Sequence, residues 1–342
     1  MFCNNVHVHF IDDLRVPRLT TPNQTTQAPS VYNSRVSSVL PTPSTISRPS
    51  NVYFSNGIDS EPIYGPTRRL DFELEMGYFV SKPVPWGERM PIEEAREHIF
   101  GFVLLNDWSA RDHQLFEMRP LVSTHFPPVQ FRQDKTSFFL CFLEKRSPHS
   151  LTASLRPPQG PFHSKGFGTS ISNWIVPLDA LHPFSCAPNT PQDPPPFPHL
   201  SWPTPGNAAL DIKLKVTLVR AGEEFPLGSS NLKYMYWTPY QQLAHHAASG
   251  CGMLTGDLLG TGTISGAGMD ERGVKRELGC LYEVEMTGSG VMPVVAEGEG
   301  KGYQSGYLED GDEIILEGWC EDGDANAVLG FGECRGRIAP PK

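Results

Sequence analysis

Residues 70–76 read LDFELEM, and apolar side chains alternate with acidic ones along this stretch. Side chains two residues apart on a strand point to the same face, so this period predicts a β-strand. The run GFVLLND at 101–107 is short and apolar, which is typical of a buried strand. DIKLKVTLVR at 211–220 alternates cleanly, and DEIILEGWC at 312–320 is one of several short segments between glycines. We therefore expect a mostly β fold (α+β) with few helices.

Helices are expected at two places. PIEEAREHIF at 91–100 has a proline at an early position and acids in its first turn. The second helix covers 238–249, where Thr238 is the N-cap, Pro239 takes the first helical position and Gln241 completes a capping box. The 32 glycines and 33 prolines of the chain favour turns over further long helices.

Composition excludes several classes of protein. The 342 residues carry a net charge of −10, which argues against binding to a phosphate backbone. No run of 18 apolar residues occurs and the N-terminus lacks the apolar core of a secretory signal. The seven cysteines are odd in number and form no C-x-x-C motif, so they indicate reduced thiols rather than disulfides or a zinc site. We expect a cytoplasmic protein that binds neither nucleic acid nor membrane.

Two segments differ in composition from the rest. Serine, threonine and proline fill 19 of the 34 positions from 17 to 50, and such a composition buries little apolar surface. We expect residues 1–50 to be poorly ordered and residues 51–342 to form one domain. Residues 122–159 carry five basic and two acidic side chains in an otherwise acidic chain, and we interpret them as an insertion into that domain.

Glu73 and Glu75 are the first candidates for chemistry. On a strand both side chains project to one face, where two carboxylates repel each other unless a cation lies between them. A solvated strand face explains the same pattern, because acidic residues are seldom buried without a partner. Asp107 ends the apolar run and could supply a third carboxylate, whose oxygens suit Mg²⁺ or Ca²⁺. The alternative for this segment is an ordinary capped helix start.

Arg111 and Gln114 follow this carboxylate closely. They lie one turn apart if a helix begins in this segment, so both could point at one site; a surface ion pair is the alternative for the arginine. Lys165 and Thr169 bound the glycine-spaced loop KGFGT, which could approach an anionic ligand closely. The loop does not match the pattern of a nucleotide phosphate-binding loop.

Two features near residue 250 complete the candidates. GTISG at 262–266 is a tight, hydroxyl-bearing loop that contains Thr263. His245 and His246 are neighbours on the second helix, so they face different directions and cannot share a metal ion. We interpret both as structural histidines.

Taken together, these segments resemble the fumarylacetoacetase (fumarylacetoacetate hydrolase) family. The resemblance covers the chain from about Tyr32 to its end, except for 122–159, and NDWSARD and GTISG are specific to the family. The stretches that carry it are LDFELEM (70–76), EHIFGFVLLNDWSARD (97–112), KGFGTSISNWIVPLDAL (165–181), NLKYMYWTPYQQLAHHAASG (231–250), GDLLGTGTISG (256–266) and LEDGDEIILEGWC (308–320). It implies the mixed β-sandwich roll of the family's C-terminal catalytic domain, assembled as a homodimer.

The resemblance also implies an activity. It is the metal-dependent hydrolysis of a carbon–carbon bond in a β-diketone, which converts fumarylacetoacetate and water to fumarate and acetoacetate in the last step of tyrosine and phenylalanine catabolism. Such chemistry needs a metal ion, here Mg²⁺ or Ca²⁺, to chelate two substrate oxygens. It also needs donors aimed at the developing oxyanion and a general base for water, usually a histidine held by a carboxylate.

Each candidate residue receives a role from the resemblance. The implied metal ligands are Glu73, Glu75 and Asp107, and the metal site is completed by Lys165 and Thr169. The oxyanion would be stabilised by Arg111, Gln114 and Lys165. The substrate would be bound by Arg111 and Gln114 together with Tyr32 and Thr263. The catalytic histidine would be oriented by Glu283, which we expect in a strand over LYEVEM at 281–286.

Three family features are missing from this sequence. We expect no counterpart of the segment that supplies a fourth carboxylate ligand and the general-base histidine, and no small N-terminal barrel. Met118 stands where the family has a tyrosine. We therefore expect metal binding with slow hydrolysis or none. The alternatives are a hydrolase of an acylpyruvate or similar 2-oxo acid, and a non-catalytic metal-binding dimerisation partner.

Residues 122–159 interrupt the resemblance. The segment begins with Val-Ser and ends with Gln, whose codons can read as the two ends of an intron. We hypothesise a retained, in-frame intron. The alternative is a genuine surface insertion, which loops tolerate well.

Overall fold

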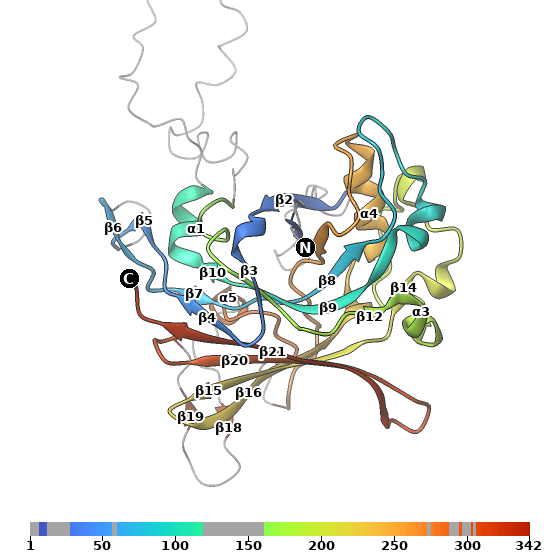
Figure 1. The fold of residues 1–342 in the computed structure, drawn as a ribbon. Helices are drawn as coiled ribbons and strands as arrows, with labels where there is room; N and C mark the ends of the chain where they lie inside the picture. The colour runs from blue at the N-terminus through green and yellow to red at the C-terminus, as the bar shows by residue number, and fades with distance from the viewer. Residues whose placement is uncertain are drawn as a thin grey trace, which may run out of the picture.

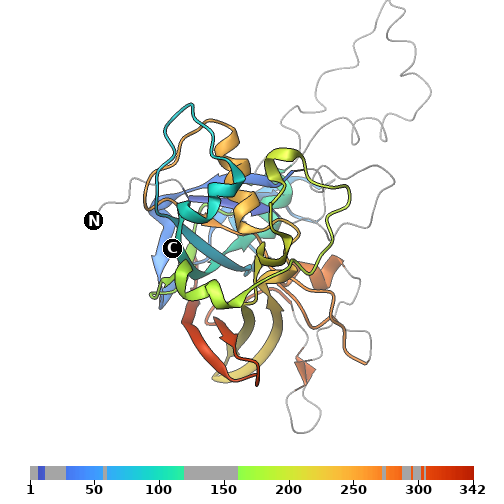
Figure 2. The ribbon, with the colours of Figure 1, turned by 90° about the vertical axis from the view of Figure 1, so that its right-hand side faces the viewer.

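The computed structural model describes residues 7–11, 28–56, 60–118, 161–271, 275–286, 294–295, 302–303 and 306–342. Strands dominate these residues and the helices are short, which confirms the mostly β class. Two larger sheets lie one above the other, as Figures 1 and 2 show from two directions. No helix in the described part of the chain is long and apolar enough to cross a membrane.

The larger sheet has eight strands among the described residues. Their order is β2-β1-β17-β8-β9-β11-β3, and β12 also pairs with β9. The sheet is mixed, because β1 runs parallel to β17 and β3 parallel to β11 while the other pairs are antiparallel. Its strands are β1 (His7–Ile11), β2 (Ser30–Ser34), β3 (Val39–Pro41), β8 (Leu74–Val80), β9 (Ile99–Asp107), β11 (Thr169–Ile171), β12 (Val176–Pro177) and β17 (Leu258–Gly260).

As far as the structure describes the chain, the smaller sheet has five strands in the order β16-β15-β20-β21-β4. They are β4 (Ser44–Ser47), β15 (Lys213–Arg220), β16 (Glu223–Asn231), β20 (Glu313–Glu321) and β21 (Ala327–Ala339). Four two-stranded ladders complete the described sheets. They pair β5 (Ser50–Phe54) with β6 (Pro62–Pro66), β7 (Leu70–Asp71) with β10 (Ser109–Ala110), β13 (Ser185–Cys186) with β14 (Ala209–Leu210), and β18 (Val294–Val295) with β19 (Gly302–Tyr303).

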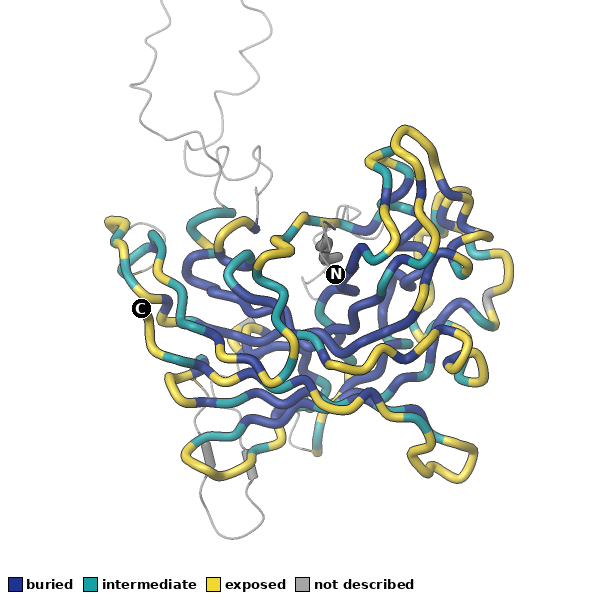
Figure 3. Tube along the Cα trace, viewed as in Figure 1, coloured by how far each residue is buried: buried dark blue, intermediate teal, exposed yellow. Residues whose placement is uncertain are grey.

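The core lies between the two larger sheets, where Figure 3 shows most of the buried chain. Leu74 and Met76 of β8 and Leu104 of β9 alternate onto this face and are fully buried. Glycine allows the sheets to approach, since a Cβ at Gly336 of β21 would lie 2.3 Å from the Trp108 ring. The opposite face of β8 and β9 therefore carries the odd-numbered residues, and these include the acidic candidates.

The α-helices in the described ranges are α1 (Arg111–Glu117), α3 (Leu178–Leu181), α4 (Pro239–Ala248) and α5 (Tyr282–Met286). The predicted capping box of α4 is confirmed. The Thr238 side chain accepts the N–H of Gln241, and the Gln241 side chain accepts the N–H of Thr238 at 3.0 Å. The first predicted helix is a 3₁₀-helix, η3 (Ile92–His98). Its acids lie in the first turn as expected.

The expectation of little order over residues 1–50 is wrong for the part that the structure describes. Strands β2, β3 and β4 lie in this segment and belong to both larger sheets. The polar side chains find partners on other strands: the hydroxyl of Ser44 in β4 lies 2.6 Å from that of Ser170 in β11, and Thr42 Oγ1 accepts the N–H of Arg335 in β21 at 2.6 Å. A serine- and threonine-rich sequence can therefore form strands once neighbouring strands satisfy its polar groups.

Two other expectations concern LYEVEM and residues 122–159. LYEVEM forms the helix α5 rather than a strand, because the Asp71 carboxylate accepts the N–H groups at the start of this helix. The interpretation of residues 122–159 as an insertion concerns a segment outside the described residues, and it stays a prediction.

Candidate active site

Three buried carboxylates meet where β8 and β9 lie side by side. The antiparallel register pairs Leu74 with Asn106, which places Glu73 beside Asp107 and Glu75 two residues farther along on the same face. One carboxylate oxygen of each acid lies within 4.8 Å of the corresponding oxygens of the other two. All three residues are buried, so a solvated strand face does not explain them.

Two buried cations lie among these carboxylates. Lys165 Nζ donates to Asp107 Oδ2 at 2.8 Å and also contacts the Glu73 carboxylate. Arg111 Nη1 lies 2.8 Å from Glu73 Oε1. Both side chains are about 95% removed from solvent, with 4% of Lys165 and 5% of Arg111 exposed. The structure therefore brings the predicted lysine and arginine into direct contact with the predicted metal ligands.

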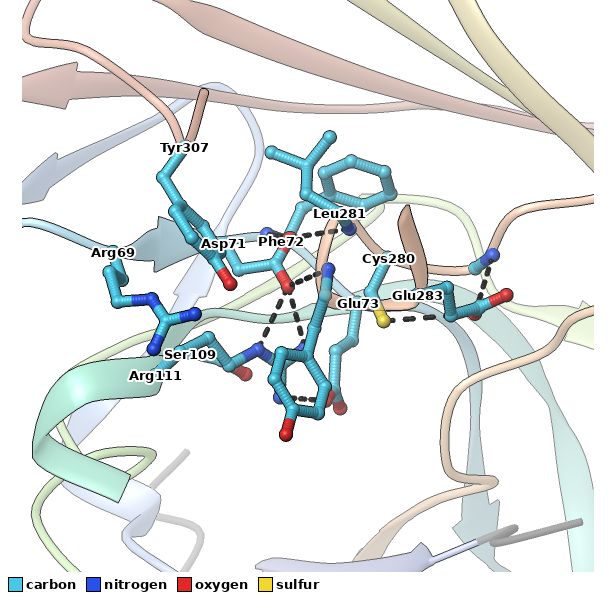
Figure 4. Close-up of polar contacts among 12 residues, drawn as sticks. Arg69, Asp71, Phe72, Glu73, Ser109, Arg111, Cys280, Leu281, Glu283 and Tyr307 are labelled. Carbon is cyan, nitrogen blue, oxygen red and sulfur yellow. Dashed lines mark hydrogen bonds and ion pairs between the residues drawn. The ribbon is translucent and has the colours of Figure 1, made fainter. Parts of the chain in front are cut away.

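Asp71 anchors the guanidinium of Arg111. Arg111 Nε donates to Asp71 Oδ2 at 2.8 Å, and the same carboxylate accepts the N–H groups of Leu281 at 2.8 Å and of Tyr282 at 3.0 Å. Figure 4 shows Asp71 between the guanidinium and the start of α5. One buried carboxylate thus fixes both Arg111 and the helix that carries Glu283.

Gln114 and Tyr32 extend the cluster. Helix α1 begins at Arg111, so Gln114 lies one turn farther along as expected, and its Oε1 accepts a hydrogen bond from Arg111 Nη1 at 3.1 Å. Tyr32 reaches the cluster from β2 and its O–H donates to Asp107. The structure therefore joins these two of the four predicted substrate-binding side chains to the residues that surround the carboxylates.

The two threonine candidates lie in different surroundings. Thr169 pairs with Asp107 across β11 and β9, and its Oγ1 is buried without a hydrogen-bond partner in the described part of the chain. Thr263 is half-buried and follows Gly262, whose N–H donates to Glu75 at 3.1 Å. The φ angle of Gly262 is 82°, a value that favours glycine and lets the backbone turn toward the carboxylate.

Burial and the two cations together set the protonation states in the cluster. Burial by itself raises the pKa of Glu73, but Lys165 and Arg111 outweigh it and hold this pKa well below its usual range. Burial by itself lowers the pKa of Lys165, but Asp107 and Glu73 outweigh it and raise this pKa. Burial and the nearby charge of Asp107 raise the pKa of Tyr32. At neutral pH Glu73 is therefore ionised, and Lys165 and Tyr32 are protonated.

The charge balance fits a divalent cation. The buried cluster combines four carboxylates with two cations, which leaves a formal charge of −2; its members are Asp71, Glu73, Glu75, Asp107, Arg111 and Lys165. Carboxylate and hydroxyl oxygens are the ligands that Mg²⁺ and Ca²⁺ prefer. The buried Thr169 hydroxyl adds such an oxygen without a partner among the described residues. The donor set therefore suits either ion.

Glu283 is buried on α5 and held by several donors. Ser265 Oγ lies 2.5 Å from its carboxylate, Lys275 Nζ lies 2.6 Å away, and the N–H of Gly279 donates at 3.1 Å. Cys280 Sγ lies 3.7 Å from the same carboxylate (Figure 4). Its role in orienting a catalytic histidine stays a prediction.

Asp71 is absent from the residues predicted from the sequence. It shares the two-residue period of Glu73 and Glu75, and that period is the signal that could have identified it. Its contact with α5 depends on the tertiary structure. Asn106 has a similar supporting position, because its side-chain oxygen accepts the N–H of Glu73 at 3.1 Å.

Fold and site together define a mixed β-sheet domain built around a buried cluster of carboxylates and cations. The chain belongs to the fumarylacetoacetate (FAA) hydrolase C-terminal family, whose model matches residues 5–140 and 143–339. The family model matches from residue 5, whereas the resemblance was expected to begin at about Tyr32. The matched region therefore includes the described strand β1 as well as β2.

Curated relatives support the same family. The chain is 39% identical over 314 residues to a fumarylacetoacetase of Rattus norvegicus and over 315 residues to one of Dictyostelium discoideum. Each alignment covers 91% of this chain and 62% of the relative, so the chain spans less than two thirds of these relatives. A solved structure of Cg1458 with an inhibitor has a TM-score of 0.50 at 14% identity, covering 98% of this chain and 77% of that one, and it supports the fold alone.

Proposed function

We propose that this chain is the catalytic domain of a divalent-metal-dependent hydrolase that cleaves a carbon–carbon bond of a β-diketone. The proposed substrate is fumarylacetoacetate, and the products are fumarate and acetoacetate, as in the last step of tyrosine and phenylalanine catabolism. The names of the curated relatives support this substrate. The observation that carries the proposal is the buried cluster of Glu73, Glu75 and Asp107 in contact with Lys165.

In this proposal Glu73, Glu75 and Asp107 hold Mg²⁺ or Ca²⁺, and Thr169 and Lys165 complete the site. When bound, the ion supplies a centre that the two oxygens of a β-diketone can chelate. The strand register fixes the three acids relative to one another before the ion binds. Less conformational entropy is therefore lost on binding.

The cations act on the charge that develops during the reaction. Water adds to a carbonyl carbon, the carbon–carbon bond then breaks, and its electron pair stays with the departing enolate, which takes up a proton. Arg111 and Lys165 are buried and positively charged, so they stabilise the oxyanion more strongly than solvated cations would. Gln114 is positioned by Arg111 and binds the substrate together with Tyr32 and Thr263.

Glu283 is proposed to orient a general-base histidine; the segment expected to supply that histidine has no recognisable counterpart in this sequence. A general base contributes about 10²–10⁴-fold to such reactions, so a chain without one turns over more slowly by a factor in this range. We also propose that the protein is a cytoplasmic homodimer. All five cysteines that the structure describes are free thiols, which agrees with a reducing compartment.

The test is an absorbance assay of fumarylacetoacetate turnover with Mg²⁺ or Ca²⁺, repeated with an acylpyruvate. Variants Glu73→Ala and Glu317→Ala are compared, because Glu317 forms an ion pair on β20, away from the carboxylate cluster. We expect turnover that Glu73→Ala abolishes and Glu317→Ala leaves unchanged. Faster turnover of the acylpyruvate would show that the substrate is a 2-oxo acid of this kind and not fumarylacetoacetate. Metal binding without any turnover would establish the non-catalytic alternative.

A further inference from the structure

A second cluster of metal-ligating side chains lies outside the carboxylate site. It lines a cavity of about 450 Å³ beside the C-terminal end of α4. Three histidines and one cysteine contribute to this cavity, namely His199, His245, His246 and Cys251. Imidazole and thiolate are softer ligands than carboxylate, so this cluster selects different ions from those that suit the acids of β8 and β9.

The backbone after α4 places Cys251 against the helix. The helix ends at Ala248, and Gly250 and Gly252 have φ angles of 73° and 74°, so the chain reverses on both sides of the cysteine. A Cβ at Gly252 would lie 3.2 Å from the backbone of Trp86, which leaves little room for another residue type there. The exposed thiol is thus held beside the last turn of α4 by the chain itself.

The distance between the Cys251 sulfur and the Nε2 nitrogen of His246 matches the distance between two ligand atoms on a tetrahedral ion. Cys251 Sγ lies 3.6 Å from His246 Nε2. A tetrahedral zinc ion with bonds of about 2.3 Å to sulfur and about 2.0–2.1 Å to nitrogen holds these atoms about 3.6 Å apart. An ion can therefore bridge the pair without movement of the backbone.

A third imidazole lines the same cavity. The ring of His199 lies 6.4 Å from that of His245, centroid to centroid. Within the described residues, His199 does not form a three-ligand group with His246 and Cys251.

We propose that His246 and Cys251 form a binding site for a soft divalent cation of the zinc type, separate from the carboxylate site. No third histidine or cysteine ligand lies close to this pair in the described part of the chain, so the remaining positions on the ion are open to water. Neighbouring residues on a helix point about 100° apart, so His245 and His246 face different directions and His245 is not a ligand of this ion. Tyr32 borders the cavity and also donates to Asp107, so the proposed site adjoins the carboxylate cluster.

The test is a titration of the full chain with Co²⁺ while Mg²⁺ in excess occupies the carboxylate site. A thiolate bound to Co²⁺ gives a charge-transfer band in the near ultraviolet, which carboxylates cannot produce. We expect this band in the parent chain, its loss in Cys251→Ser and at least a tenfold weaker Co²⁺ affinity in His246→Gln. Added Zn²⁺ should remove the band by displacing Co²⁺.

Two matched variants identify the thiol. Cys280→Ser removes the thiol beside Glu283, and Cys186→Ser removes a half-buried thiol on β13. Both should keep the band. The proposal is overturned if the parent chain shows no thiolate band, or if the band survives in Cys251→Ser. Because Cys251 is exposed, circular dichroism of Cys251→Ser should match the parent, so loss of the band reports the ligand rather than the fold.

Discussion

Lys165 Nζ lies 2.8 Å from Asp107 Oδ2, and the same ammonium contacts Glu73. One buried cation therefore joins two of the three clustered carboxylates. In the absence of a metal ion this contact offsets much of the repulsion between acids that the strand register places side by side. Lys165 thus contributes to the stability of the metal-free domain as well as to the proposed chemistry.

Replacing this lysine should unfold the metal-free domain more easily. Lys165→Met leaves Asp107 and Glu73 buried without their shared partner, so we expect the free energy of unfolding to fall by about 3–5 kcal/mol. A divalent cation should recover part of this loss because it restores positive charge. Urea unfolding with and without Mg²⁺ measures both effects. Lys82→Met, which breaks an exposed pair with Glu97, should cost at most about 1 kcal/mol.

Removal of a divalent cation should lower the melting temperature of the parent chain. A ligand that binds only the native state stabilises it by an amount that grows with its concentration. Glu75→Gln removes one charged ligand, so Mg²⁺ or Ca²⁺ should raise its melting temperature less than that of the parent. Differential scanning fluorimetry with and without a chelator measures this difference. An equal shift in Glu75→Gln and in Glu317→Gln would exclude Glu75 as a ligand.

Asp71→Asn should impair catalysis more than its effect on stability explains. The substitution removes the charge that holds Arg111, and a displaced guanidinium costs about 10²-fold in turnover. The matched control is Asp312→Asn, because the buried Asp312 also accepts a hydrogen bond from an arginine, the half-buried Arg220, at 2.7 Å. Both variants should lose stability, but only Asp71→Asn should lose kcat. Equal activities in the two variants would contradict a positioning role for Asp71.

Thr238→Ala should weaken the start of α4. The side chain of Thr238 caps the helix, and loss of such a cap costs about 1 kcal/mol. Thr238→Ser keeps the hydroxyl and should retain most of the stability. Chemical unfolding of the two variants beside the parent measures the difference. A parent-like midpoint for Thr238→Ala would show that the capping box contributes little.

Stability should fall as the pH drops below about 6.5. Burial lowers the pKa of His245 and His246 in the folded chain from an ordinary value of 6.5. Below 6.5 the unfolded chain therefore binds more protons than the native chain, and protonation favours unfolding. His245→Gln should show a shallower loss of stability between about pH 7 and pH 5. His182→Gln, at an exposed position, should follow the parent.

The sequence determined the elements whose stabilising contacts are local. The capping box of α4 involves only residues 238–241, and its prediction is confirmed. The apolar run of β9 identified a buried strand, although β8, β11 and β12 supply its hydrogen-bond partners. The same-face rule identified Glu73 and Glu75 as neighbours, the glycine-spaced loop pointed to Lys165, and the family resemblance added Tyr32. These signals depend on spacing and residue type, which the sequence contains.

Tertiary structure decided the rest, because the deciding partners are distant in the chain. Asp71 accepts the first N–H groups of α5, so residues 282–286 form a helix where the sequence favours a strand. The serine-rich strand β4 is ordered by its pairing with β21. Burial of the acids depends on a lysine and an arginine from two other segments. A buried charge is stable only with such partners, and the sequence alone does not reveal which distant residues supply them.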